Sequence, residues 1–251
     1  MVTEANRRAY SGAPAGSAEA VQIDAGLRQY MLRVYNYMGS GLFLSGIVAW
    51  LVANNDGIRS LFFQSAEGGA MGYTGLGMIA VFAPIGLILA MSFGANKMST
   101  STVQALYWAF VALMGVGLSV ALIAYTGESV ARVFFITAIS FGGLSLYGYT
   151  TKRDLSAFGT FLMMGLIGLL IAGVVNIFLQ SAMLHFVYSA VGVLLFAGLT
   201  AYDTQSIKNT YFQAQGSSME GKSAVMGALR LYLDFVNLFM FLLQFLGARR
   251  D

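Results

Sequence analysis

The chain alternates between seven long hydrophobic blocks and shorter polar connections. Apolar and polar residues do not alternate within the blocks, so the pattern predicts helices and not the strands of a barrel. About 20 apolar residues suffice to cross a bilayer as a helix, which satisfies its own backbone polar groups there. The blocks are Val34–Ala53, Gly72–Phe93, Val103–Tyr125, Val130–Tyr149, Leu155–Leu179, Leu184–Ser206 and Ala224–Leu246. The sequence therefore predicts an all-α integral membrane protein, a bundle of seven transmembrane helices.

The polar segments define the remaining organisation of the chain. Two connections, Asn54–Met71 and Ile207–Ser223, are longer than the others and rich in Gly, Ser and polar residues, as is typical of loops. Residues 1–26 are polar and lack the apolar core of a signal peptide. We expect a disordered cytoplasmic tail over residues 1–26, a transmembrane domain over residues 27–247 and a short tail over residues 248–251.

Basic residues gather in alternate connections, and this bias predicts the orientation in the membrane. They precede the first block and recur after the second, fourth and sixth blocks: Arg7, Arg8, Arg28, Arg33, Lys97, Lys152, Arg153, Lys208 and Lys222. The N-terminus is therefore predicted to be cytoplasmic, and seven spans place the C-terminus on the opposite side. Arg249 and Arg250 favour a cytoplasmic C-terminus instead, so a re-entrant last segment with six true spans is the alternative.

The composition narrows the function classes. The chain is 57% hydrophobic and 10% charged, whereas soluble domains carry roughly 25% charged residues. It has no cysteine and one histidine, which excludes disulfides, thiolate chemistry and a multi-histidine metal site within one chain. That histidine, His185, lies at the outer start of the sixth block and needs no special role. The net charge of +3 is spread over the connections and does not indicate nucleic-acid binding. Nothing demands an oligomer, so we expect a monomer in the lipid bilayer.

Two of the eleven acidic residues, Asp203 and Asp234, lie inside hydrophobic blocks, and the other nine lie in tails, loops or block ends. Acidic side chains inside a bilayer are costly, face the bundle interior and usually serve function. Asp203 lies about one turn before the cytoplasmic end of its block, and Asp234 lies in the cytoplasmic half of the next. Because consecutive helices are usually neighbours, we expect the two carboxyl groups to face each other. The structural alternative is an Arg230–Asp234 pair with Asp203 as a capping residue.

The seventh block carries a polar stripe around its aspartate. Arg230 precedes Asp234 by four residues and Asn237 follows it by three, so the three share one helix face. Such a face indicates the bundle interior or a water-filled path. The tyrosine hydroxyl groups available to the pair belong to Tyr202 and Tyr232.

Two carboxyl groups at low dielectric cannot both be charged cheaply, so the pair is expected to titrate as one unit. In its charged form the pair attracts a cation, and carboxylate oxygens suit Ca²⁺. Two carboxylates and one amide are few ligands, so a Ca²⁺ site at Asp203 and Asp234 is expected to be weak, with no other cofactor. Such a site suits proton sensing, cation passage or both.

Pro84 lies in the middle of the second block, where it removes the hydrogen bond to the Ala80 carbonyl and predicts a kink. The kink is either static, which is the simpler interpretation, or a hinge for gating.

Three stretches together identify a family: DAGLRQYMLRVYNYMGSGL at 24–42, AYDTQSIK at 201–208 and LYLDFVNLFMFLLQFLG at 231–247. They resemble the Bax inhibitor-1 family, also called the transmembrane Bax inhibitor motif family, and most of all its bacterial members. The resemblance runs from about Asp24 to Gly247. It implies a seven-helix fold in the bacterial inner membrane, with the last helix between two three-helix layers. It also implies a pH-sensitive Ca²⁺ leak governed by two aspartates, which map onto Asp203 and Asp234.

One part of the family pattern is missing from this chain. The family has an arginine near the cytoplasmic end of the second helix, which holds one aspartate in a closed state. The matching stretch, MSFGANKMST at 91–100, contains no arginine, so Lys97 and Arg230 are the cations available to replace it. An acid found within the second helix of some members is also absent from IAVFAPIGLILAM at 79–91.

Three functions follow as alternatives. The first is a pH-sensitive leak for Ca²⁺ and other cations. The second is an interaction protein, because bacterial relatives bind and restrain a membrane-bound ATP-dependent protease, which would grip the polar N-terminal tail. The third is an intramembrane aspartyl protease, a class that carries Tyr-Asp in one span and Gly-x-Gly-Asp in the next. Here the bulky residues Leu231, Tyr232 and Leu233 precede Asp234 and close access to a substrate strand, so we expect a channel and not an enzyme.

Overall fold

The computed structural model describes residues 15–65 and 71–250, with side chains from residue 25 onward, and these ranges are almost entirely helical. Seven long helices form the bundle: α2 (Ala15–Asn54), α4 (Gly75–Gly94), α5 (Thr100–Ala124), α6 (Gly127–Thr150), α7 (Ser156–Leu179), α8 (Ala182–Ala214) and α9 (Glu220–Leu246). Each contains a stretch long and apolar enough to cross a membrane. The prediction of an all-α membrane protein with seven spans is confirmed.

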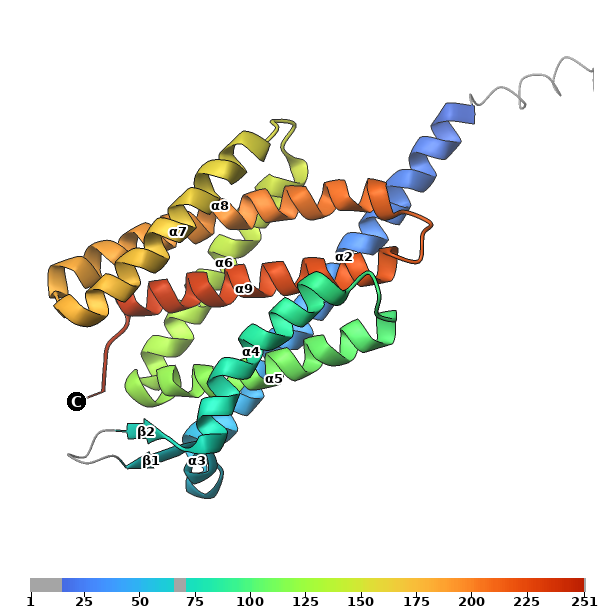
Figure 1. Cartoon of the computed structure of the whole chain (residues 1–251). Coiled ribbons are helices and arrows are strands. Elements are labelled where there is room, and N and C mark those ends of the chain that lie inside the picture. Colours follow the sequence, from blue (N-terminus) through green and yellow to red (C-terminus); the bar gives the residue numbers. More distant parts are fainter. Residues whose placement is uncertain (1–14, 66–70, 251) are drawn as a thin grey trace, which may run out of the picture.

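Helix α9 lies at the centre of the bundle, between two layers of three helices (Figure 1). In one layer α5 packs against both α2 and α4, and in the other α8 packs against both α6 and α7. Burial agrees with this central position, because 72% of the apolar stretch of α9 is buried, compared with only 11% of that of the outer helix α7. The central last helix that the family resemblance implies is confirmed.

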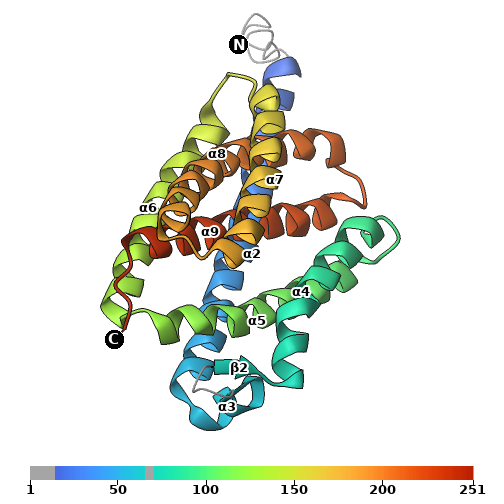
Figure 2. The same cartoon turned by 60° about the vertical axis from the view of Figure 1, so that its left-hand side comes forward.

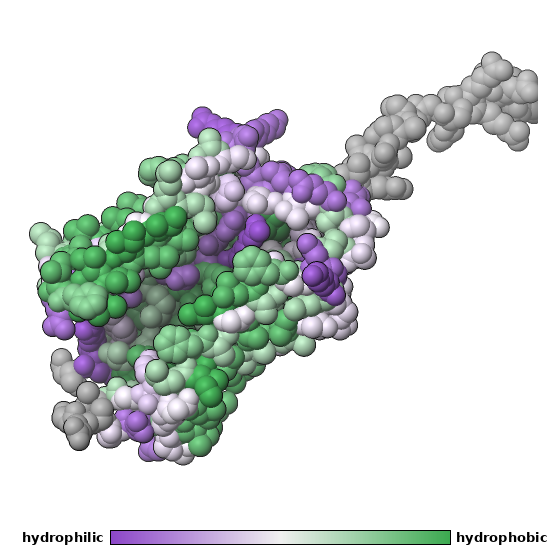
Figure 3. Space-filling model, in the orientation of Figure 1, coloured by the Kyte–Doolittle hydropathy of each residue, from purple (hydrophilic) through white to green (hydrophobic). Residues whose placement is uncertain are grey.

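The outward faces of the layers are hydrophobic. Figure 3 shows broad hydrophobic areas over α7 and over α4. Phe93 and Phe178, on these two helices, are 83% and 82% exposed. Apolar surface of this extent requires an apolar solvent, and the bilayer supplies it.

Helices α2 and α5 owe their close packing to small residues. A Cβ at Gly115 on α5 would lie 2.7 Å from the carbonyl oxygen of Ser45 on α2. Gly41, one turn before Ser45, leaves no room for a Cβ beside the Tyr107 hydroxyl. Without side chains at these glycines the two helix backbones approach closely, as is common in membrane bundles.

Helix α8 extends further than the hydrophobic pattern predicts. The block ends at Ser206, but the helix continues to Ala214 and ends just before Gly216, whose φ of 70° is left-handed. The segment IKNTYFQA at 207–214 has no Pro or Gly to interrupt a helix. The first half of the predicted loop Ile207–Ser223 is therefore helical. Asp203 therefore lies eleven residues, about 16 Å, before the end of the helix, although it lies only three residues before the end of its hydrophobic block.

Helix α2 begins at Ala15, so the predicted disordered tail is wrong for residues 15–26, while residues 1–14 lie outside the described residues. The sequence AGSAEAVQ at 15–22 is rich in alanine, the best helix former, and continues without a break into the first block.

The predicted loop Asn54–Met71 also has more structure than its composition indicates. It contains the short helix α3 (Asp56–Phe62), followed by the antiparallel hairpin of β1 (Phe63–Ser65) and β2 (Met71–Tyr73). The Asn55 side chain accepts a hydrogen bond from the Ile58 N–H and caps α3.

Helix α9 crosses the whole bundle. Its first turn lies beside the start of α5, where a Cβ at Gly221 would be 3.1 Å from the Thr100 side chain. Its far end lies near the end of α5, close to the C-terminus (Figure 2). There Arg249 forms a β-bridge with Tyr125 and places its guanidinium over the Tyr125 ring. A re-entrant last segment with six true spans is therefore wrong. The basic C-terminal residues lie at the opposite end of the bundle from the α4–α5 connection.

Single cysteines can test this topology without background, because the chain has none. We expect Arg250→Cys to react with a membrane-impermeant maleimide added to spheroplasts. Lys97→Cys should react only after the membrane is opened, because these two exposed positions lie at opposite ends of α5. Labelling of both positions from the same side would contradict the crossing of α9.

Candidate functional site: an aspartate pair at the α8–α9 interface

The two intramembrane aspartates meet at the interface of α8 and α9. The carboxyl groups of Asp203 and Asp234 come within hydrogen-bonding reach of each other. Asp234 is 4% exposed and Asp203 is half-buried, so Asp203 forms the more accessible edge of the pair. Asp234 Oδ2 is buried without a donor among the described residues. A single proton shared by the two carboxyl groups would satisfy that oxygen, whereas two bare carboxylates would repel each other.

Arg230 is the cation whose charge acts on both aspartates. Its side chain is exposed one turn from Asp234, and it forms no ion pair with either carboxyl group, since the ion pairs of the described residues join other side chains. The Arg230–Asp234 contact of the structural alternative is therefore not formed. Lys97 is exposed in the α4–α5 connection and also has no ion-pair partner among the described residues.

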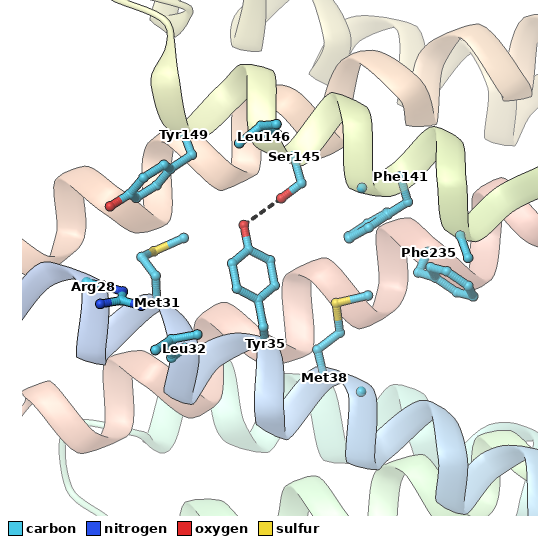
Figure 4. A pocket seen from close by; sticks show the side chains of 13 residues that line it. Arg28, Met31, Leu32, Tyr35, Met38, Phe141, Ser145, Leu146, Tyr149 and Phe235 are labelled. Atoms are coloured by element: carbon cyan, nitrogen blue, oxygen red, sulfur yellow. Dashed lines mark hydrogen bonds between the residues drawn. The ribbon is translucent and has the colours of Figure 1, made fainter.

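A chain of hydroxyl groups fixes the next residue of α8. Thr204 donates to the Thr200 carbonyl at 2.7 Å, so its oxygen accepts from Ser145 on α6 at 2.9 Å. Ser145 has then used its proton, so the Tyr35 hydroxyl on α2 donates to it at 2.6 Å (Figure 4). The chain joins α2, α6 and α8 directly beside Asp203.

Two further residues of AYDTQSIK anchor α8 to the connection between α6 and α7. The Gln205 amide donates to the Arg153 carbonyl and accepts from the Leu155 N–H, both at 2.8 Å. The Lys208 ammonium donates to the Tyr149 carbonyl, at the end of α6, at 2.9 Å. These contacts hold one face of α8 against α6 and the α6–α7 connection. Asp203 lies on the face of α8 that contacts α9.

The two candidate tyrosines point away from the pair. Tyr202 packs against Gly159 on α7, where no room remains for a Cβ. Tyr232 is fully buried, and its hydroxyl lies 2.7 Å from Ser45 Oγ on α2. Ser45 donates its own proton to the Val111 carbonyl at 2.6 Å, so Tyr232 is the donor to Ser45. Tyr232 thus attaches α9 to the α2–α5 layer and is not a partner of the aspartates.

We expect Ser45→Ala to cost about 1–3 kcal/mol of unfolding free energy, because it leaves the buried Tyr232 hydroxyl without an acceptor. Tyr232→Phe should cost less, since Ser45 keeps its bond to Val111. In the double variant the two losses should not add, because no unpaired hydroxyl remains. Thermal unfolding in detergent measures all three, and an additive double variant would contradict the contact.

Three other residues discussed above show no contact with the pair among the interactions of the described residues. The Asn237 amide donates to the Leu233 carbonyl of its own helix at 2.8 Å and is half-buried. Pro84 is buried within α4, which runs through it as one helix. His185 lies half-buried in the first turn of α8, where its carbonyl accepts from the Ser189 hydroxyl.

The interface around the pair is closed in both directions. Toward the C-terminal end of α9, the rings of Phe196 and Phe241 stack with centroids 5.6 Å apart, and Phe241 presses against Gly192. Toward the cytoplasmic end predicted from charge, Ile207 covers Gly227, where a Cβ would lie 3.1 Å away. Apolar side chains therefore pack the α8–α9 interface on both sides of the pair, while Asp203 keeps a partly exposed edge.

Sequence reasoning missed the hydroxyl chain and the anchors of α8. The stretch AYDTQSIK contains the residues concerned, Thr204, Gln205 and Lys208, which follow directly after Asp203. Their signal was the clustering of polar side chains at the end of a hydrophobic block. Ser145 and Tyr35 give no such signal, because small hydroxyls and tyrosines are common in membrane helices.

Comparisons with known proteins identify the family of this chain. Residues 27–251 match the family described as "Inhibitor of apoptosis-promoting Bax1". An uncharacterised protein of Caulobacter vibrioides is 47% identical over 98% of both chains. The inner membrane protein YbhL of Escherichia coli is 43% identical over 93% of this chain and 97% of its own. An uncharacterised protein of Rickettsia prowazekii is 47% identical over 91% of this chain and 93% of its own. With a family match over the entire bundle and relatives that align along almost their whole length, the chain belongs to the Bax inhibitor-1 family of membrane proteins.

Proposed function

We propose that the protein is a leak pathway for cations, Ca²⁺ among them, and that protonation of the Asp203–Asp234 pair controls it. The meeting of two carboxyl groups in the interior of a membrane bundle is the observation that carries the proposal. Burying acids without an ion pair lowers stability, so a purely structural role would leave the cost uncompensated.

The shared proton is the proposed control element. When the pair holds one proton, the hydrogen bond between the carboxyl groups joins α8 to α9 and the packed interface persists. When that proton is lost, the two negative groups repel each other across the same interface and attract a cation. Arg230 is close enough to compensate part of this charge, and we propose that it takes the role of the missing arginine on the second helix.

The donor set at the pair suits brief contact with Ca²⁺. Within the described residues, no group of three or more His, Cys, Asp and Glu side chains is placed to hold a metal ion. The two aspartates offer carboxylate oxygens, but Asn237 is bonded to its own helix. Ca²⁺ usually takes six to eight oxygen ligands, so water would supply most of them and binding would be weak. Weak binding permits release, which passage requires.

The other two functions have less support. Leu231 and Tyr232, directly before Asp234, are both fully buried, which leaves no opening for a peptide strand at a protease site. Restraint of a membrane protease would rest on the N-terminal tail, of which residues 1–14 lie outside the described residues. We place the protein in the bacterial inner membrane with a cytoplasmic N-terminus, in keeping with the charge bias and with the name of the Escherichia coli relative.

Liposomes that contain the purified protein and a Ca²⁺-sensitive dye test the proposal. External Ca²⁺ should enter faster than into protein-free liposomes, and the rate should change between about pH 5 and 8, where most proteins remain folded. An entry rate equal to that of protein-free liposomes at every pH would refute a leak. A rate that exceeds it but is constant over this range would refute control by protons.

A further inference from the structure

An apolar groove separates α2 from α6 along the outside of the bundle. Its first part has a volume of about 710 Å³ and its second about 770 Å³, and the two parts share Gly39, Ala138 and Phe235. Phe235 of α9 therefore lines both parts. Gaps of this size are far larger than the small voids within packed protein interiors, so the groove is a surface that something else fills.

The groove is as long as the hydrocarbon core is thick. On α2 it runs from Arg28 to Leu51, about 35 Å at the rise of a helix. The hydrocarbon core of a bilayer is about 30 Å thick. A single acyl chain in one leaflet would therefore fit lengthwise, with room beyond its end.

One end of the groove is cationic. Arg28 is the only charged side chain that lines either part within the described residues, and no acidic side chain lines them. Figure 4 shows Arg28 at the same end as the Tyr149 side chain, away from Phe141 and Phe235. The Lys208 ammonium lies 5.3 Å from the centre of the Tyr149 ring and adds a second positive charge at this end. By the distribution of basic residues this is the cytoplasmic end.

We propose that the groove binds one anionic phospholipid of the cytoplasmic leaflet. The lipid phosphate contacts the Arg28 guanidinium, whose planar set of N–H donors suits phosphate oxygens. One acyl chain lies along the apolar walls of α2 and α6. We infer an anionic headgroup because the Arg28 guanidinium has no acidic partner among the lining residues. The inference concerns binding alone and does not depend on cation passage through the aspartate pair.

Glycines on the two walls give a direct test. Gly39 on α2 and Gly142 on α6 line the groove, and a Cβ at either would have no neighbour within 4 Å. Gly39→Leu and Gly142→Leu should therefore fold and place a side chain where the acyl chain lies. Gly143 has equally open surroundings but is not a lining residue, so Gly143→Leu is the matched control.

Native mass spectrometry of the full chain, in micelles with phosphatidylglycerol or phosphatidylethanolamine of the same acyl chains, measures the binding. The wild type and Gly143→Leu should retain one phosphatidylglycerol at activation energies that strip other lipids, and both groove variants should lose it. Arg28→Gln should lower the preference for phosphatidylglycerol by about tenfold, the size of one charge-assisted contact.

Three results would overturn the proposal: equal retention by the wild type and both groove variants, equal retention of the two lipids by the wild type, or an unchanged preference in Arg28→Gln. Thermal unfolding of each variant in the same micelles identifies any that fails to fold. The two groove variants lie on different helices, so either one that folds decides the outcome.

Discussion

Asp234→Asn should flatten the pH dependence of Ca²⁺ entry into liposomes, and Asp203→Asn should do the same. Asparagine keeps the shape of aspartate but carries no exchangeable charge, so the pair could no longer alternate between a shared proton and mutual repulsion. One proton at the pair allows the wild-type rate to change by up to about tenfold per pH unit, and either variant should remove most of that change. The measurement is the initial rate of dye fluorescence at several pH values with equal protein per liposome.

An aspartate outside the bundle supplies the control. Asp154 is exposed in the α6–α7 connection. Its carboxylate accepts hydrogen bonds from the hydroxyl group and, with a smaller effect, from the backbone N–H of Ser156, and both lower the pKa of Asp154. Asp154 therefore stays ionised over the tested range, and Asp154→Asn should leave the profile unchanged. An unaltered profile in both Asp203→Asn and Asp234→Asn would exclude the pair as the sensor. An equal effect of Asp154→Asn would show that the assay reports surface charge.

The double variant separates a coupled pair from two independent acids. Because Asp203 and Asp234 meet at one interface and, as proposed, share one proton, the loss of either should already disable the unit. The profile of Asp203→Asn/Asp234→Asn should thus match that of a single variant, as expected for residues that act together. Effects that add in the logarithm of the rate would indicate two separate sites.

The helices could be predicted from the sequence because hydropathy and length act locally. Seven blocks became seven spans, and Leu155–Leu179 differs from α7 by one residue. Helix ends were harder to predict wherever the helix leaves the lipid. Hydropathy falls at Ser206, but helix α8 continues to Ala214 and ends just before Gly216, whose backbone is left-handed. Asp203 is therefore farther from the end of its helix than from the end of its hydrophobic block.

The partners of the aspartates depend on helix rotation, which one sequence does not determine. Spacing put Asn237 on the face of Asp234, but its amide bonds the Leu233 carbonyl of the same helix. Tyr202 is next to Asp203 in sequence, yet consecutive helical residues point about 100° apart and it contacts α7 instead. The groove likewise arises because α2 and α6 belong to different layers, which is a property of the assembled bundle.

Gly148→Ala should cost about 1–3 kcal/mol of unfolding free energy, as is usual when an atom is forced into a packed interface. Gly148 on α6 faces Ala201 on α8, and an added Cβ would collide with the Ala201 carbonyl oxygen. That oxygen belongs to the backbone, so the collision can be relieved only by moving one helix away from the other.

Gly143→Ala, on the same helix, should be neutral or stabilise by up to about 1 kcal/mol, because its Cβ meets nothing and alanine favours the helix. The comparison also concerns the site, since Ala201 lies two residues before Asp203 and a displaced α8 carries that carboxyl group with it. Gly148→Ala should therefore alter the pH profile of Ca²⁺ entry and lower the unfolding temperature in detergent. Gly143→Ala should leave the pH profile unchanged and should not lower the unfolding temperature. Equal stability of the two variants would show that α6 and α8 are less tightly apposed at Gly148 than the structure has them.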